Sequence, residues 1–313
     1  MSTGKYLFVL FCLLGFVVAG IELSSEPVAK PYYLPTTSSH YPREFVDSTG
    51  ERLLIWRKPM RIVSQTLATD EILLAICDPA RIIALSALAD NSEYSNVVEE
   101  AKAVKGRTNR GAEEVLKMQP DLIFVSSYSR AEFVELLRTA KAPLYKFSSF
   151  DTLEDIERNI LAIGEVIDER ARAEALVESM RQKLASICSA LPKRDRPLRV
   201  LSYGLSGSTA GRGTLFDDIL HRLGAINLSA EHGIKGYAKI GAEQVVAWNP
   251  DVIVAGAEPG SIERIKEQML RDPAIAMTDA ARNGRIVVID NRHFLSVSHH
   301  IIKGIEALAV GLR

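Results

Sequence analysis

The chain has 313 residues, of which 38 are basic and 39 acidic, so its formal net charge is -1. Hydrophobic residues make up 47% of it and charged residues 25%, a composition typical of a globular protein. This balanced charge excludes an electrostatic argument for nucleic acid or an anionic membrane as the main partner. Because domains usually have about 100 to 200 residues, we expect two lobes and not one continuous core.

The first twenty residues differ from the rest of the chain. Lys5 provides a small positive region, an apolar run extends from residue 6 to residue 19, and small residues end it at Val18-Ala19-Gly20. These features predict a cleavable secretory signal over residues 1–20 and a periplasmic protein. The run is short for a membrane span, which needs about 20 apolar residues, and an uncleaved anchor is the alternative. Cys12 lies inside the run and not directly after small residues, so we do not expect a lipid anchor.

Two cysteines, Cys77 and Cys188, would remain after cleavage. They are too few for a metal knuckle or a disulfide-rich scaffold. An oxidising compartment permits one disulfide between them. Free cysteine is commonly buried, however, and we interpret the two residues as separate members of the core.

Residues 21–44 contain several prolines among Ser, Thr and Tyr and are interpreted as an irregular leader. Residues 45–56 have the composition of a β-hairpin with a Ser-Thr-Gly turn. Beyond them, short apolar runs alternate with segments of helical periodicity, which predicts parallel strands joined by crossover helices. The expected strands are residues 61–64, 81–85, 121–125, 144–147, 199–203, 251–255 and 285–289.

These strands divide into an N-terminal α/β lobe, residues 45–150, and a C-terminal α/β lobe, residues 197–313. The helix-rich residues 151–196 lie between them. Apolar residues from Leu153 to Ile167 recur at spacings of three and four, which predicts a helix capped by Asp151 or Thr152. A second pattern follows Asp168, and its roughly 22 residues would form a rod of about 33 Å. Such a rod would leave little room for a large hinge movement between the lobes.

An internal repeat is the strongest signal in the chain. The segments 113–125 and 243–255 both start with a glutamate, continue as a short helix, and pass through Pro-Asp into an apolar strand. Proline ends each helix, and the apolar run after it is typical of a buried parallel strand. The repeat therefore predicts an equivalent glutamate, Glu113 or Glu243, at the start of an equivalent helix in each lobe.

Several weaker motifs accompany the repeat in a fixed order. They are Pro59-Met-Arg-Ile-Val63, Thr69-Asp-Glu-Ile-Leu-Leu, Gly224-Ala-Ile-Asn227, Asp272-Pro273 and Asn283-Gly-Arg-Ile-Val-Val-Ile-Asp290. Around a central long helix, they resemble the helical-backbone (class III) periplasmic solute-binding proteins for cobalamin, ferric siderophores and haem. The resemblance covers roughly residues 45–312. It implies an α/β fold of two Rossmann-like lobes with mostly parallel sheets, joined by a long backbone helix.

The resemblance also implies a function, which is to capture a corrinoid or a ferric siderophore and deliver it to an ABC transporter permease dimer in the inner membrane. In that family a glutamate on each lobe meets arginines of the permease, and the matching residues are Glu113 and Glu243. Charge-assisted pairs of this kind are strong and directional, and two on one rigid body act as a bivalent ligand. The alternative interpretation is that an acidic residue in a first turn stabilises its helix by about 0.3 to 1 kcal/mol.

The ligand is expected in the cleft, because ligands of open α/β sheets bind beyond the carboxyl ends of the strands. A corrin or haem needs flat apolar contacts, whereas an anionic ferric chelate favours arginine. The aromatic candidates in the loops are Tyr94, Tyr128, Tyr203, Tyr237, His293 and Phe294, and the basic candidates are Arg107, Arg110, Arg130, Arg212 and Arg292. Tyr237, Thr108 and Ser126 occupy places where the cobalamin binder of the family has tryptophan, so its site does not transfer directly.

Other classes of protein leave weaker signals. The six histidines form no cluster at metal-ligand spacing, so we expect neither a protein-coordinated metal nor a resident cofactor. A haem-binding or free-metal-binding importer component is one alternative, and an enzyme with two Rossmann-like lobes is another. The glycine-rich segment 204–213 fits no phosphate-loop pattern and Ser206 no nucleophile elbow, so no catalytic residue is assigned. We expect a monomeric binding protein.

Overall fold

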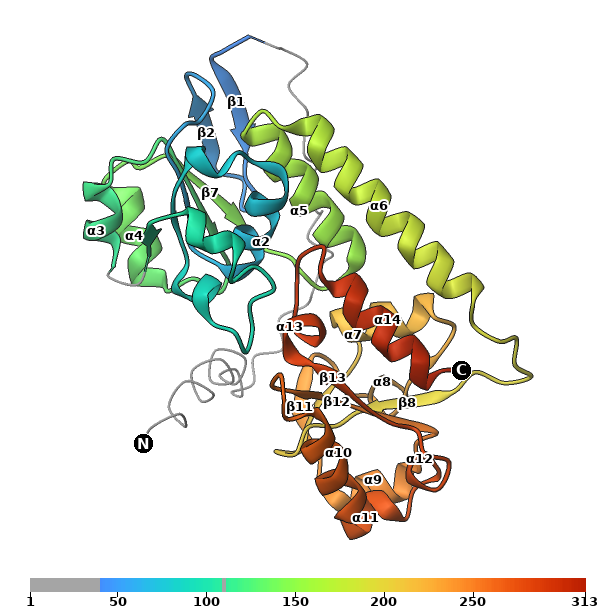
Figure 1. Ribbon diagram of the computed structural model, residues 1–313. Coiled ribbons are helices and arrows are strands. Elements are labelled where there is room, and N and C mark those ends of the chain that lie inside the picture. Colours follow the sequence, from blue (N-terminus) through green and yellow to red (C-terminus); the bar gives the residue numbers. More distant parts are fainter. Residues whose placement is uncertain (1–39, 109–110) are drawn as a thin grey trace.

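The computed structural model describes residues 40–108 and 111–313. The predicted signal sequence, most of the predicted leader, and Arg110 lie outside these residues. Figure 1 shows two α/β lobes, one above the other, with the long helix α6 (Arg170–Ser189) running along one side of both. Within the described residues, none of the helices combines the length and hydropathy that a membrane span requires.

The N-terminal lobe contains a parallel five-stranded sheet of order β5-β4-β3-β6-β7. Its strands are β3 (Ile62–Ser64), β4 (Ile82–Leu85), β5 (Gly106–Arg107), β6 (Leu122–Ser126) and β7 (Leu144–Phe147). All residues of the central strand β6 are buried, as expected for a parallel strand covered by helices on both faces. The helices are α2 (Leu67–Ile76), α3 (Ala112–Lys117) and α4 (Ala131–Thr139), with the 3-10 turns η1 (Pro79–Arg81), η2 (Ala87–Asp90) and η3 (Glu100–Ala103).

The predicted hairpin precedes this sheet, as β1 (Arg43–Val46) paired with β2 (Arg52–Ile55) in antiparallel register. Its first strand begins two residues before the expected boundary. The Asp47 carboxylate closes the turn by accepting the backbone N–H groups of Thr49 at 2.8 Å and Glu51 at 3.1 Å. Phe45, Leu53 and Ile55 are buried in the core, so the hairpin is packed against the lobe.

The C-terminal lobe contains a parallel four-stranded sheet of order β10-β8-β12-β13. Its strands are β8 (Arg199–Ser202), β10 (Ile226–Asn227), β12 (Val252–Ala257) and β13 (Ile286–Asp290), and a separate antiparallel ladder joins β9 (Ser208–Ala210) to β11 (Tyr237–Lys239). The helices are α7 (Leu215–Arg222), α8 (Leu228–Glu231), α9 (Ala242–Trp248), α10 (Ile262–Arg271), α11 (Pro273–Ala276), α12 (Asp279–Arg282), α13 (Asn291–Phe294) and α14 (Ile301–Gly311).

The expected fold class is confirmed, because both sheets are parallel and share one core topology. In the N-terminal sheet β6 lies between β3 and β7, and in the C-terminal sheet β12 lies between β8 and β13. Each strand predicted from the sequence is present, with ends that differ by two residues or fewer. The strands that sequence analysis did not predict, β5, β9, β10 and β11, have only two or three residues each and so carry no readable periodicity.

Two long helices connect the lobes. In α5 (Leu153–Val166), Thr152 forms the N-cap predicted for it and makes a capping box with Asp155. The helix α6 follows with 20 residues, which corresponds to about 30 Å. One hydrophobic cluster runs from Ile62 in the first sheet through Ile156 and Val177 to Ile305 on α14, so the connection is a packed part of the core.

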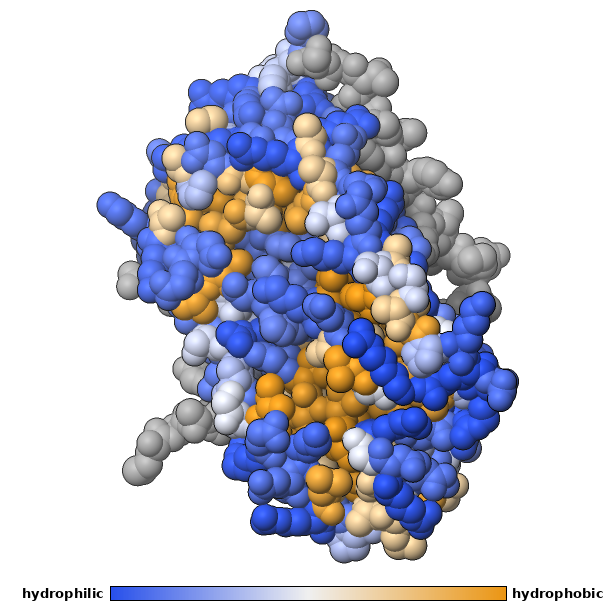
Figure 2. Space-filling view, turned by 45° about the vertical axis from the view of Figure 1, so that its right-hand side comes forward, coloured by the Kyte–Doolittle hydropathy of each residue, from blue (hydrophilic) through white to orange (hydrophobic). Residues whose placement is uncertain are grey.

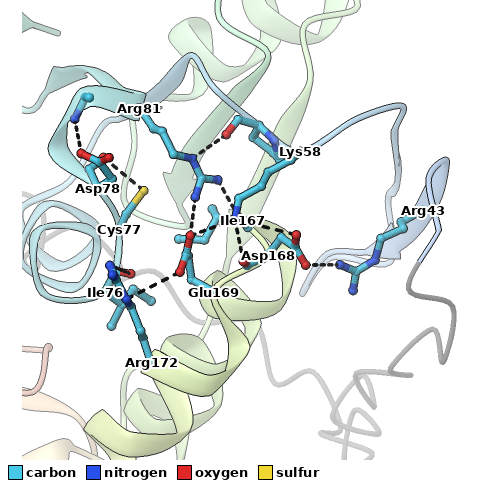
Figure 3. Close-up of polar contacts among 12 residues, drawn as sticks. Arg43, Lys58, Ile76, Cys77, Asp78, Arg81, Ile167, Asp168, Glu169 and Arg172 are labelled. Carbon is cyan, nitrogen blue, oxygen red and sulfur yellow. Dashed lines mark hydrogen bonds and ion pairs between the residues drawn. The ribbon is translucent and has the colours of Figure 1, made fainter.

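The junction between α5 and α6 is fixed by buried arginines (Figure 3). Arg81 donates to the Ile167 carbonyl at 2.6 Å and to the Glu169 carboxylate at 2.7 Å. Lys58 pairs with the same carboxylate at 3.0 Å, and Arg43 is bonded to Asp168 at 3.4 Å. Buried charges need such partners, because leaving one unpaired costs several kcal/mol. These contacts hold the start of α6 on the N-terminal lobe.

The two remaining cysteines are free thiols, as interpreted from the sequence. Cys77 is buried at the end of α2, and burial raises the pKa of its thiol to about 11. Cys188 is half-buried on α6, and burial also raises its pKa. Both thiols therefore stay protonated at neutral pH.

Candidate functional site

The Pro-Asp repeat forms an equivalent turn from helix to strand in each lobe. We call this turn the corner, and it comprises residues 113–125 in one lobe and 243–255 in the other. The Asp121 carboxylate accepts the backbone N–H groups of Met60 at 2.9 Å and Arg61 at 2.8 Å. The Asp251 carboxylate accepts the backbone N–H of Arg199 at 2.8 Å. In both lobes the aspartate thus ties the start of a central strand to the start of the neighbouring strand. The aspartates of the repeat have a structural role, which explains their position after the proline.

The residue before each proline adopts the same unusual backbone conformation. Gln119 has φ of 49° and Asn249 has φ of 45°. A left-handed residue commonly ends a helix. The residue before a proline also avoids the right-handed helical region. The two short helices of the repeat, α3 and α9, therefore end in the same way.

Glu113 and Glu243 are each the second residue of these helices. Both are exposed, and neither forms an ion pair or hydrogen bond with a residue that the structure describes. Because α3 leads into β6 and α9 into β12, the two glutamates hold the same place in their lobes. In Figure 1 both helices lie on outer parts of the lobes, away from α5 and α6.

Loops at the carboxyl ends of the strands face the opposite lobe. Tyr94 follows β4, and its pKa is raised by burial and by the Glu258 carboxylate, which follows β12 in the other lobe. The pKa of Tyr237 on β11 is likewise raised by burial and by Asp151. Tyr94 therefore lies close enough to a loop of the C-terminal lobe to feel its charge, and Tyr237 close enough to Asp151, which precedes α5.

A further aromatic pair lies in the N-terminal loops. Tyr128, which is 43% exposed, follows β6, and its ring centroid is 5.6 Å from that of Phe150 after β7. Tyr237 is 56% exposed. Sequence analysis missed Phe150, although an aromatic residue directly after a predicted strand was a usable signal. Tyr128, Phe150 and Tyr237 together offer the flat apolar contacts that a macrocycle would need.

Arg107 is the last residue of β5, and its guanidinium is fully engaged. It forms a bidentate pair with Asp90 at 2.7 and 2.6 Å. Its other N–H groups donate to the carbonyls of Val104 at 2.6 Å, Gly106 at 2.8 Å and Ala101 at 3.1 Å. A guanidinium has five donors, and all five have partners here. Arg107 therefore fixes the loop and leaves no donor for a ligand.

The other basic candidates differ in how free they are. Arg292 pairs with Asp290, with its Nε 3.0 Å from the carboxylate. Arg130 and Arg212 are exposed and form no side-chain hydrogen bond or ion pair with the described part of the chain. Arg212 lies in the glycine-rich segment, beside β11. Among the predicted basic residues that the structure describes, Arg130 and Arg212 are thus the ones with guanidinium groups available for an anion.

Three aromatic candidates of the C-terminal lobe are packed into the protein. Tyr203 is buried in the second hydrophobic cluster. Phe294 meets Phe216 edge to face at 6.1 Å. The backbone of His293 lies against Gly304, where a Cβ would be 2.6 Å from the His293 carbonyl oxygen, and burial lowers the pKa of this histidine. These three residues are thus less exposed than Tyr128 and Tyr237.

A buried carboxylate on α2 connects the two lobes. Glu71 is 2% exposed and accepts the backbone and side-chain N–H groups of Asn96 at 3.0 and 2.9 Å. From the C-terminal lobe, Ser298 and Ser296 donate to its other oxygen. The Asn96 amide also donates to the Arg292 carbonyl at 2.7 Å. Burial raises the pKa of Glu71. Sequence analysis gave it no role, because its partners are far away in the chain.

The described residues contain no group of three His, Cys, Asp or Glu side chains that could hold a metal ion. Ser206, at the exposed glycine-rich turn, is hydrogen-bonded only to Ser208, at 3.4 Å, among the described residues. Among the described side chains, none that could act as a base is hydrogen-bonded to the Ser206 hydroxyl, as activation of a nucleophile would require. The described side chains of the cleft can bind by stacking, hydrogen bonding and charge.

Comparisons with known proteins agree with this geometry. Residues 62–293 match the family described as periplasmic binding protein. The cobalamin-binding protein of Halobacterium salinarum is 21% identical over 268 residues, covering 84% of this chain and 72% of that protein. The Fe(3+) dicitrate-binding periplasmic protein of Escherichia coli is 26% identical over 244 residues, covering 75% and 78%. The crystal structure of a periplasmic haem-binding protein from Pseudomonas aeruginosa superposes with a TM-score of 0.65 at 26% identity, covering 80% and 92%. The chain belongs to the periplasmic binding protein family.

Proposed function

We propose that the protein is the periplasmic substrate-binding component of an ABC importer, which captures a bulky metal chelate and delivers it to a permease dimer in the inner membrane. The duplicated corner is the observation that carries this proposal. Two lobes of the same topology each present an exposed glutamate without a described partner, Glu113 and Glu243, at the start of equivalent helices. An enzyme would have no need of such a pair, whereas a carrier that meets a two-fold symmetric partner does.

The proposed ligand is a corrinoid or a ferric siderophore. Similar proteins are named for cobalamin and for ferric dicitrate, which are both large metal chelates. Tyr128, Phe150 and Tyr237 would supply flat contacts to the ligand, and Arg130 and Arg212 would supply charge-assisted hydrogen bonds to an anionic chelate. In this proposal the chelate brings its own metal, and the protein provides no metal ligand.

Delivery would use both lobes at once. A glutamate pairs well with the fork of an arginine, and the second contact becomes intramolecular once the first has formed. This gain requires a body that holds its two corners at a fixed spacing. The packed connection through α5 and α6 and the buried Glu71 contacts provide such a body. We therefore propose that the lobes move little when the ligand binds.

Export would precede these steps. The first twenty residues would be removed as a signal peptide, and the mature chain would act in the periplasm as a monomer. Mass spectrometry of the protein recovered from a periplasmic extract checks this. The mature mass should correspond to cleavage near Gly20, and an uncleaved chain in the membrane fraction would contradict it.

The chelate is identified by titrating the mature protein with cyanocobalamin, ferric dicitrate, a ferric hydroxamate and haem, with absorbance as the readout. We expect saturable one-to-one binding of a corrinoid or a ferric siderophore. An Arg130→Ala/Arg212→Ala double variant should bind an anionic ferric chelate about tenfold or more weakly, since each charge-assisted hydrogen bond contributes about 1.5 to 3 kcal/mol. Arg271→Ala, on the outer helix α10, is the matched control. Binding of haem or a bare metal ion alone, or turnover of a nucleotide or ester, would contradict the proposal.

A further inference from the structure

A hollow lies between α6 and α14, and none of the predicted cleft residues lines it. It has a volume of about 340 Å³. Binding pockets for small organic molecules usually measure about 300 to 1,000 Å³. Its apolar lining comes from Leu176, Met180 and Ile187 on α6 and Ile302 on α14. On the α6 side of the molecule, Figure 2 shows hydrophobic surface bordered by hydrophilic side chains.

Two adjacent histidines lie at one end of this groove. The rings of His299 and His300 are 4.0 Å apart at their centroids. The Nδ1 atom of His299 and the Nε2 atom of His300 are buried, and neither has a hydrogen-bond partner among the described residues. Buried polar atoms in folded proteins nearly always have a partner, which can be a bound water or ion. Because both rings line the same hollow, they could offer these nitrogens to a polar group bound there.

The charged residues around the groove indicate which charge a bound ligand would carry. Lys183 on α6 and Lys303 on α14 both line it, are exposed, and form no ion pair with a described residue. Burial lowers the pKa values of His299 and His300, to about 4 and about 3, and the positive charges of Lys303 and Lys183 add to this, as do His299 and His293 for His300. The N-terminus of the 11-residue helix α14, which carries a partial positive charge, lies at His300 beside the groove and adds to the positive charge there. Glu306, one turn further along α14, is the opposing charge. This environment repels a metal cation and attracts an anion.

We propose that the groove between α6 and α14 binds a small organic anion with a carboxylate or phosphate head and an apolar body. The head would accept hydrogen bonds from the two histidines and pair with Lys183 and Lys303. The apolar body would lie on the side chains of Leu176, Met180, Ile187 and Ile302. No predicted cleft residue lines the groove, so this site does not depend on which chelate the protein carries.

The test uses the mature protein, with octanoate, octylammonium and inorganic phosphate as ligands and the imidazole nitrogen resonances of ¹⁵N-labelled histidine as the readout. We expect octanoate to shift the His299 and His300 resonances in a saturable manner. It should also raise both histidine pKa values, since a nearby anion favours the charged imidazolium. Resonances are assigned with His299→Gln and His300→Gln.

The variants separate this site from a non-specific effect. Lys183→Ala/Lys303→Ala should weaken octanoate binding about 100-fold or more, because two charge-assisted contacts of roughly 1.5 kcal/mol or more each are lost. Lys105→Ala/Lys193→Ala, which removes two exposed lysines outside the groove, should leave it unchanged. If octylammonium bound as tightly as octanoate, the site would not require an anionic head. If phosphate bound as tightly as octanoate, the site would not require an apolar body. Absence of any histidine shift with all three ligands would overturn the site itself.

Discussion

The helix α2 of the N-terminal lobe and the helix α7 of the C-terminal lobe start alike and then diverge. Thr66 and Thr214 are their N-caps, each followed by leucine, and each threonine accepts the backbone N–H three residues later. In α2, Glu71 then reaches the serines of the C-terminal lobe. In α7, Asp218 instead accepts the backbone N–H of Leu153 at 2.9 Å, at the start of α5. The two lobes thus share a framework, and each uses its own carboxylate to hold the connection between them.

The outer corners of the lobes are more alike than the cleft loops. Asp121 and Asp251 each accept a backbone N–H at the start of the neighbouring strand, from Arg61 and Arg199, and Gln119 and Asn249 share a left-handed conformation. The loops facing the gap share no such pattern, since the C-terminal lobe adds the β9-β11 ladder beside its parallel sheet. A surface that meets two equivalent subunits has to be duplicated, whereas a ligand without two-fold symmetry requires two different walls. We infer that the duplicated corners serve the proposed permease dimer and that the differing cleft loops serve the ligand.

The largest effect is expected from reversing both outer charges. Glu113→Lys/Glu243→Lys should lower uptake of the chelate by about 100-fold or more, because two charge-assisted contacts of about 1.5 kcal/mol or more each become repulsive. Affinity for the chelate should not change. The matched control, Glu132→Lys/Glu263→Lys, reverses exposed first-turn glutamates of α4 and α10, which lose the same helix-dipole interaction. If both pairs of substitutions reduced uptake equally, the loss would not be specific to the corners, and the proposed docking role of Glu113 and Glu243 would be wrong.

The buried acid of α2 predicts an unusual pH dependence. Burial raises the pKa of Asp70 to about 7, against hydrogen bonds from Ser64 and Ser86 that lower it. A folded pKa above the unfolded one means that stability is lost as pH rises through that range. Relative to Asp70→Asn, the wild type should lose up to about 4 kcal/mol of unfolding free energy between pH 4 and pH 8. Urea titrations at several pH values measure this, and parallel pH profiles for the two proteins would disprove it.

The corner aspartates should matter to a similar degree in the two lobes. Asp251→Ala removes a bond to the Arg199 N–H and a bidentate contact with the largely exposed Arg196, and Asp121→Ala removes two backbone bonds. We expect losses of about 2 to 3 kcal/mol in each case, with Arg196 adding little because surface ion pairs are weak. Asp195→Ala, at an exposed residue, is the control. A loss in one lobe only would show that the corners are not equivalent.

Variants of Glu71 test whether the connection between the lobes is rigid or hinged. Glu71→Ala leaves Asn96 and Ser298 without their partner and should destabilise the protein by about 2 kcal/mol. Glu71→Gln keeps one acceptor and gains a donor, so we expect a smaller loss. Small-angle scattering with and without the chelate should show little closure for the wild type and more for Glu71→Ala. A large closure of the wild-type protein would contradict a rigid connection.

Much of the framework was predictable from sequence, because it depends on local patterns. The spacing from Leu153 to Ile167 predicted α5 and its cap, and the paired Glu-to-Pro-Asp segments predicted the duplicated corners. The contacts of Glu71 were not predictable, since its partners Ser296 and Ser298 lie over two hundred residues away. The ion pair between Arg107 and Asp90 was also not predictable, because the composition of a loop does not show which N–H donors are already hydrogen-bonded within the protein. Sequence therefore identified the candidate loops and could not separate packed from available side chains.

The central claim, that both corners dock on one permease dimer, is tested most directly by disulfide crosslinking. Cysteines would replace Glu113 and Glu243 in a background without Cys77 and Cys188, and each would be paired with a cysteine at a docking arginine of the permease. We expect both crosslinks to form in one complex, one to each of the two permease subunits. Crosslinking through only one lobe, or of both lobes to the same subunit, would contradict the claim.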